Sequence, residues 1–423
     1  MQRVIIIFFI IFPYSSNAQD TIRMSFDNLV NLNNSNNLLL KTNDLNYQIS
    51  VEEFRNNLSS FLPDFSFGDI RIDYDGVAQS TEGEFVDVDK NNQWMGTSWK
   101  LDWDLRNLFL DPFRYKNKKL EALYSKKINV IDEQIRVYQL YYLLVASIEK
   151  EKAVSKFISR NTSIIEQLVL QVKAGLKLES DLLLAKSNLN NLKILKIKQE
   201  QEVDDFSQDL LQSLNLSLSI IVDPDCNFYE NNIYLINNKS NFQDRLELLQ
   251  IDMQKKNLKL QRNKFSYGFL LPKVSLGYND GYFGPTFAFS MDKRNILSTS
   301  LMWNIPLSSI FPSGEYKINN NLYKIKTIEK QQLEKKIKSE LITLENAFVK
   351  IDKQYMLAKE SFNFSKKAYQ QSFKRQALGT ANQLELFHAE KEYLNAQFLY
   401  IDLIAERHKV GLEKQASFEK KYK

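Results

Sequence analysis

The sequence predicts a mainly α-helical fold with a membrane β-barrel portion, organised as an internal duplication. Three observations support this prediction. Long stretches carry apolar residues at heptad spacing, which is typical of helices that pack side by side. Four short stretches alternate apolar and polar residues, as β-strands do. The whole series of elements then recurs roughly 200 residues later.

The N-terminal stretch 1–18 is predicted to be a secretory signal peptide. Arg3 provides the positive charge, the apolar run 4–12 is too short to span a bilayer, and the triplet 16–18 is a small-x-small cleavage site. A buried N-terminal helix is the alternative. The mature chain is therefore expected to be exported. Cys226 is the only cysteine, so no disulfide framework is expected.

Composition favours long helices, because Gly (12) and Pro (8) are scarce among 423 residues. The net charge is +5, and basic residues alternate with acidic ones along the helical stretches, so no nucleic-acid binding is expected. The best candidate for a membrane helix, 128–145, contains Asp132, Glu133 and Arg136 and is not sufficiently apolar. Any membrane crossing is therefore expected to use β-strands.

The first copy is predicted to occupy 19–223. Its second strand alternates most clearly, with Trp99, Leu101 and Trp103 on one face and polar residues on the other. The acidic segment 75–96 is expected to be a loop. The predicted elements are a helix at 26–58, strands at 63–75 and 97–107, a very long helix at 112–172 and a helix at 177–216.

A connector at 224–240 leads to the second copy, which is predicted to occupy 241–412. Leu271-Pro272 corresponds to Leu62-Pro63 before the first strand of each copy. The predicted elements are a helix at 242–269, strands at 273–282 and 297–308, a very long helix at 314–377 and a helix at 380–412. The basic, aperiodic tail 413–423 has two alternatives, disorder or packing around the helices.

Each copy contains a break between two long helices, at Gly175 and at Gly379. Thr380 stands three residues before Gln383, which is the spacing of a capping box and predicts a helix start. The apolar residues that follow the two breaks correspond one to one: Leu182, Ala185, Leu189 and Leu192 in the first copy, Leu386, Ala389, Tyr393 and Ala396 in the second.

The four predicted strands have the length, about 9–11 residues, that crosses a membrane when tilted. Their apolar faces suit lipid, with Trp99, Trp103, Leu301 and Trp303 as candidate lipid-facing residues. Four strands cannot close a barrel, and each unpaired backbone group in lipid costs several kcal/mol. Three copies would supply twelve strands, whereas the charged helices must lie in water.

This ordered set resembles the TolC-like family of outer-membrane efflux proteins over essentially the whole mature chain. The resemblance rests on the duplicated order, the Leu-Pro pairs and the Gly-x9-Ala motifs at 175–185 and 379–389. It implies a homotrimer in the outer membrane of a Gram-negative bacterium, with a 12-stranded barrel continued by a long periplasmic α-helical barrel. It also implies a passive exit duct for an efflux pump or type I secretion system. The partners would be a periplasmic adaptor (membrane fusion protein) and an inner-membrane transporter.

The resemblance also implies residues at the periplasmic entrance. Glu385 matches a family acid that narrows the tunnel, whereas His388 stands where a second acid is usual. Asp181 matches a latch acid, but its usual Arg partner is Ala381, so no latch through that ion pair is expected. Solvated helix residues are the alternative for Asp181 and Glu385.

The adaptor is expected to contact the two tips, with Gly175, Gly379 and Thr380 as candidate docking residues. Enzymatic functions are not supported, because the two histidines lack metal-ligand spacing and no nucleotide or hydrolase motif occurs. No catalytic residue, cofactor or metal site is expected. The alternative function is a periplasmic or secreted coiled-coil scaffold or adaptor-like interaction protein.

Overall fold

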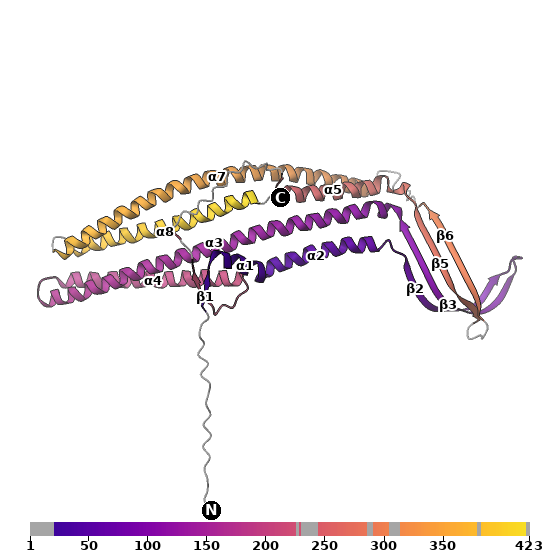
Figure 1. The fold of residues 1–423 in the computed structure, drawn as a ribbon, viewed down its shortest axis with the longest axis horizontal. Coiled ribbons are helices and arrows are strands. Elements are labelled where there is room, and N and C mark those ends of the chain that lie inside the picture. Colours follow the sequence, from indigo (N-terminus) through magenta and orange to yellow (C-terminus); the bar gives the residue numbers. More distant parts are fainter. Residues whose placement is uncertain are drawn as a thin grey trace, which may run out of the picture. The chain divides into compact units, whose positions relative to one another are not determined.

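The computed structural model describes residues 21–225, 228–229, 244–285, 291–303, 314–378 and 382–419. The predicted signal peptide and most of the connector lie outside these residues. The predicted fold class is confirmed, with very long helices and one four-stranded antiparallel sheet (Figure 1). The chain divides into two compact units. The first comprises Met1–Lys41, Ile131–Asn238 and Leu341–Glu419, and the second Thr42–Val130, Lys239–Glu340 and Lys420–Lys423.

The helices are α1 (Phe26–Asn36), α2 (Leu38–Ser59), α3 (Leu105–Lys173), α4 (Glu179–Ser213), α5 (Leu246–Ser266), the 3-10 turn η2 (Gly268–Leu270), α7 (Gly314–Ala377) and α8 (Gln383–Glu419). The strands are β1 (Thr21–Met24), β2 (Asp64–Gln79), β3 (Phe85–Asp104), β4 (Ile221–Pro224), β5 (Lys273–Pro285) and β6 (Asp292–Met302). Among the helices in the described part of the chain, none is long and apolar enough to cross a bilayer.

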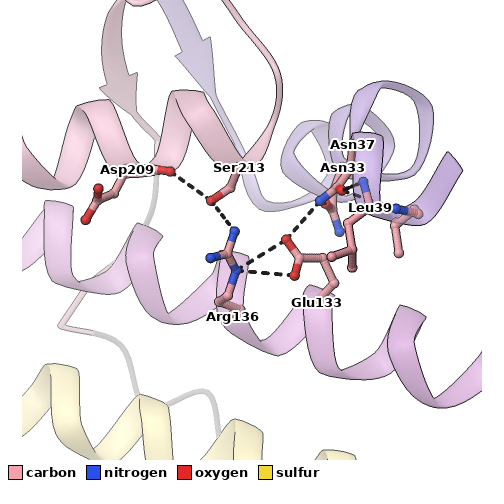
Figure 2. Close-up of polar contacts among 8 residues, drawn as sticks. Asn33, Asn37, Leu39, Glu133, Arg136, Asp209 and Ser213 are labelled. Atoms are coloured by element: carbon pink, nitrogen blue, oxygen red, sulfur yellow. Dashed lines mark hydrogen bonds and ion pairs between the residues drawn. The ribbon is translucent and has the colours of Figure 1, made fainter. Parts of the chain in front are cut away.

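The single helix predicted at 26–58 is wrong, because Asn37 divides it into α1 and α2 (Figure 2). The Asn37 side-chain oxygen accepts hydrogen bonds from the backbone N–H groups of Leu39 (2.9 Å) and Leu40 (3.3 Å), as a helix N-cap does. Its amide nitrogen donates to Asn33 Oδ1 (2.8 Å) and to Glu133 Oε1 (2.9 Å). An asparagine that binds backbone groups in this way favours a helix break over a helix interior.

Figure 2 shows how this break is joined to α3 and α4. Glu133 on α3 lies 3.2 Å from the Arg136 guanidinium, and Arg136 donates to Ser213 Oγ at 2.9 Å. Ser213, the last residue of α4, donates in turn to the Asp209 carbonyl oxygen at 2.8 Å. Because Glu133 is buried, these partners satisfy a carboxylate that would otherwise be costly to remove from water.

The first unit contains a small parallel sheet that the sequence did not predict. β1 pairs with β4 in the register Thr21↔Ile221, and the fully buried Tyr141 on α3 donates to the Met24 carbonyl oxygen at 2.9 Å. These strands cover one apolar core of the helices. Four-residue strands produce too short an alternation to be distinguished from a loop.

Two predicted helix limits are also wrong. α3 begins at Leu105, directly after β3. The Asp104 side chain accepts a hydrogen bond from the backbone N–H of Arg106 at 3.1 Å and so acts as the N-cap of α3. Pro112 therefore lies inside the helix, where the missing N–H removes one helical hydrogen bond. α8 continues to Glu419, so the first part of the predicted tail is helical. Within this extension Ala416 and Ser417 are buried.

The sheet of the second unit has the order β2-β3-β5-β6. The β2 and β6 edges have no strand partner within the described residues. The predicted loop at 75–96 is wrong, because β2 and β3 continue past β5 and β6 as a two-stranded ribbon (Figure 1). A turn closes this ribbon, with Ser80 N–H donating to the Glu84 carbonyl oxygen at 2.7 Å.

A row of glycines crosses this sheet. Gly68 on β2 pairs with Gly96 on β3, which pairs with Gly281 on β5. A Cβ atom at Gly96 would lie 2.4 Å from the Asp280 carbonyl oxygen, so the close approach of β3 and β5 requires glycine there. On β2 the apolar residues change faces at this row, without any break in register.

Candidate functional site

A row of apolar residues crosses all four strands on one face of the sheet. Phe65, Trp99, Tyr278 and Leu297 pair directly from β2 to β6, so their side chains share a face. The rings of Phe65 and Trp99 lie 4.8 Å apart. The Trp99 side chain is 47% exposed and Leu297 is 72% exposed. The row therefore presents an apolar surface that remains exposed among the described residues.

The two other tryptophans predicted to face lipid anchor the strands to the helices. Trp103 is half-buried and its indole N–H donates to the Phe61 carbonyl oxygen at 2.8 Å. Trp303 is exposed and donates to the Leu270 carbonyl oxygen at 3.3 Å. Both acceptors directly precede a Leu-Pro pair, so the two copies repeat this contact. Tryptophans with an apolar ring and a bonded N–H are typical of a membrane interface. Leu301, the fourth predicted residue, is exposed on β6.

The opposite face of the sheet is more polar. Ser98 on β3 pairs with Ser66 on β2 and Asn279 on β5. Further along β3, Lys100 and Asp102 form an ion pair at 2.6 Å. Between the helices and the glycine row the sheet thus has one apolar and one more polar face, which is the arrangement of a membrane barrel wall. Beyond the glycine row the opposite face also carries apolar residues, since Ile70 pairs with Trp94 and Trp94 with Phe283.

The first helical break ends α3 in a Schellman motif. Gly175 has φ +71°, its N–H donates to the Val172 carbonyl oxygen (3.0 Å), and Leu176 N–H donates to the Gln171 carbonyl oxygen (2.8 Å). A Cβ at Gly175 would meet nothing within 4 Å. The backbone conformation, and not space, therefore requires glycine at this candidate docking tip.

The second break differs from its prediction. Gly379, Thr380 and Ala381 lie outside the described residues. α8 begins at Gln383, and the Asn382 side chain accepts from the Glu385 N–H at 2.8 Å. Asn382 is therefore the N-cap of α8, a position where asparagine is strongly preferred. The helix starts three residues later than predicted.

The predicted entrance acids occupy matching places. Asp181 and Glu385 are each the third residue of a helix, α4 and α8, where the helix dipole stabilises a carboxylate. Glu385 also forms an ion pair with Arg375 of α7, with Arg375 Nη1 and Glu385 Oε1 2.6 Å apart. Within the described residues Asp181 has no ion-pair partner, and His388 is exposed nearly one turn after Glu385. Sequence reasoning missed Arg375, because ten residues and a helical break separate it from Glu385.

A buried acid near the second break was also missed. Glu390 on α8 is only 2% exposed and lies in an apolar cluster with Phe387 and Leu394. Phe387 lies three residues before Glu390 and Leu394 four residues after it. Glu390 therefore occupies a heptad position in a second apolar seam of α8. A glutamate at such a position is a signal present in the sequence, but it lies outside the seam through Leu386 and Tyr393 on which the helix was predicted.

Solved structures with the same fold are outer-membrane channels. The CmeC outer membrane channel of Campylobacter jejuni matches with a TM-score of 0.77 and 16% identity, covering 93% of this chain and 85% of that one. The outer membrane protein VceC of Vibrio cholerae matches with a TM-score of 0.76 and 11% identity, covering 93% and 95%. The MtrE outer membrane channel of Neisseria gonorrhoeae, in its open state, matches with a TM-score of 0.74 and 11% identity, covering 92% and 88%.

No protein-family model and no curated protein matches the sequence. At this level of identity the similarity establishes the fold. The chain has the fold of the outer-membrane channels, with long helices joined to a four-stranded part of a barrel wall, as the sequence predicted.

Proposed function

We propose that this chain is one protomer of a homotrimeric outer-membrane channel. It serves as the passive exit duct of a tripartite efflux pump or a type I secretion system. The observation that carries the proposal is the four-stranded sheet attached to helices of 64 and 69 residues. An apolar row crosses this sheet on one face, and neither edge has a strand partner within the described residues. The match to outer-membrane channels over most of the chain supports the same conclusion.

Closure of the barrel requires other copies of the chain. The unpaired β2 and β6 edges would each leave a row of backbone groups without partners in lipid, at several kcal/mol per group. Pairing β6 of one copy with β2 of the next, three times, closes a twelve-stranded barrel.

The helices show a matching requirement for neighbours. Ile342, Val349 and Met356 recur every seven residues on α7 and are 63%, 49% and 57% exposed. Such a stripe is typical of a helix that packs against another helix. A helix of the adjacent protomer would cover it and continue the barrel as an α-helical cylinder in the periplasm of a Gram-negative bacterium.

The two helical breaks are the proposed periplasmic entrance. Asp181, Glu385 and His388 would line or flank it, and the tips at Gly175, Gly379 and Thr380 would contact the periplasmic adaptor. An inner-membrane transporter would supply the energy, since the chain carries no nucleotide-binding motif.

Fractionation and conductance measurements test the proposal. The protein should sediment with outer membranes, cross-link as a trimer and form water-filled pores in a planar bilayer. Recovery as a monomer in the soluble periplasmic fraction would contradict the channel and would indicate the coiled-coil scaffold instead.

Glu385→Ala is expected to lower the cation preference of the pore, because it removes a carboxylate at the proposed entrance. Unit charges 4 Å apart in water interact by about 1 kcal/mol, so a shift of severalfold in the permeability ratio is expected. Arg375→Ala is the matched control of opposite sign, since it frees Glu385 from its ion pair and should raise cation preference. Reversal potentials in a salt gradient report both changes. If both variants keep the wild-type ratio, Glu385 does not face the pore.

A further inference from the structure

A buried polar layer crosses the helices near the two breaks. Asn161 on α3 is fully buried and donates a short hydrogen bond to Glu390 Oε1 on α8. Asn161 also donates to the Phe157 carbonyl oxygen at 3.0 Å, and its own oxygen accepts from Asn188 on α4 at 3.1 Å. Three helices from both halves of the duplication therefore meet at one carboxyl group.

The second oxygen of this carboxyl group is not satisfied. Glu390 Oε2 is buried and has no hydrogen-bond partner among the described residues. Both N–H groups of the Asn161 amide are already used, so Asn161 cannot serve Oε2 as well. A negative charge here would be spread over an oxygen that neither water nor a donor stabilises.

The surrounding groups offer little compensation for such a charge. From α3, the positive charge of Arg160 acts on Glu390. Arg160 is exposed, and its guanidinium lies 6.0 Å from the Tyr369 ring centre. From α7, Glu390 faces the buried phenol of Tyr369, whose pKa is raised mainly by burial and also by Glu390, so this neighbour brings no positive charge. From α4 it faces the uncharged amide of Asn188 through Asn161.

A groove adjoins this layer, since Arg160 and Tyr369, which both interact with Glu390, contribute to its lining. The groove has a volume of about 500 Å³ and is lined by residues of α3, α7 and α8, among them Arg160, Tyr369 and Tyr393. The Tyr369 and Tyr393 rings stack at 5.6 Å. A small separation of these helices would therefore open the carboxyl group to solvent from the groove.

We propose that Glu390 is a proton-controlled latch that holds α8 against α3 and α4 next to the helical breaks. With the proton on the carboxyl group, the layer is neutral and the helices pack closely. When the proton leaves to water, the buried carboxylate favours arrangements in which α8 moves away and the group becomes hydrated. The opening of the entrance by this movement rests on the proposed channel function, whereas the loosening itself does not.

The direction of the pH effect follows from burial. Burial raises the pKa of Glu390 to about 7 against the opposing effects of Asn161 and Arg160. A raised pKa means that the closed packing binds the proton more tightly than the open state does. The stability that the protonated Glu390 gives to the closed packing is complete below the ordinary glutamate pKa of 4.5. This stability is lost as the pH rises through about 7.

Hydrogen exchange measured by mass spectrometry tests the latch in the complete protein. After correction for intrinsic exchange rates, protection of the α8 segment 383–394 should fall about tenfold between pH 6 and pH 8. Glu390→Gln keeps the shape without the charge and should abolish this fall. The matched control Glu392→Gln removes an exposed carboxylate from the same helix and should leave the fall unchanged.

The α8 segment 401–412 is an internal control, because it packs in the other core. Burial lowers the pKa of its His408, which moves the titration of this group toward the acid side. An equal fall in both segments, or the same fall in Glu390→Gln, would overturn the latch.

A wild-type measurement covers the case in which Glu390→Gln does not fold. Infrared difference spectra should show a protonated carboxyl band in the folded protein at pH 6 that disappears by pH 8. Absence of any such band at pH 6 overturns the proposal.

Bilayer conductance over the same pH range separates the latch proposal from the channel proposal. If the protein forms no pores, the proposed channel function is contradicted. If it forms pores but hydrogen exchange of the α8 segment 383–394 does not change with pH, only the latch is contradicted.

Discussion

Trp99→Asp is expected to weaken folding into lipid by about 2–4 kcal/mol, the cost of a charged side chain on the lipid face of a membrane strand. Trp99 stands in the middle of the apolar row that crosses all four strands, and its ring contacts Phe65 at 4.8 Å. The substitution puts a charge where only hydrocarbon is available and also removes this ring contact. The yield of trimer, and urea titration of folding into lipid vesicles, measure the loss.

Ser98→Asp is the matched control for this prediction. Ser98 is the preceding residue of the same strand and lies on the opposite, polar face with Ser66 and Asn279. The same negative charge should there remain hydrated in the barrel interior and cost much less. Equal losses in the two variants would show that the apolar row does not face lipid.

Gly96→Ala is expected to destabilise the sheet by about 1–3 kcal/mol, although it adds only a methyl group. The new Cβ would lie 2.4 Å from the Asp280 carbonyl oxygen and 2.5 Å from Gly281 Cα. Both are backbone atoms, so β3 and β5 must separate where they join the two halves of the sheet. Thermal unfolding of the protein and protease sensitivity of the strands measure the effect.

Gly68→Ala provides the control, because Gly68 pairs directly with Gly96 and belongs to the same glycine row. A Cβ at Gly68 would meet no atom within 4 Å, so this substitution should change stability little. If both substitutions destabilise the protein equally, the close approach of β3 to β5 is not the cause of the loss. The conformational freedom of glycine in the row would then account for it.

Several features of the candidate site could be predicted because they depend on local sequence. Gly175 was recognisable as a helix end, and the structure places it in a conformation that glycine adopts most easily. The duplicated Leu-Pro pairs marked the start of strands, and Trp99 was recognisable from strict alternation. The helix caps Asn37 and Asn382 were not predicted, although asparagine is a preferred N-cap residue. Asparagine is so common in this chain that its presence at one position does not mark a helix start.

The sequence by itself determined the helical and strand periods, the duplication and therefore the fold class, because these follow from spacing along the chain. The tertiary structure decided which residues meet. It set the order β2-β3-β5-β6, joined Arg375 to Glu385 and brought Asn161 and Asn188 to Glu390. Such contacts depend on helix rotation and strand register. A carboxyl group that could equally be solvated or buried is assigned its environment only when neighbouring helices surround it.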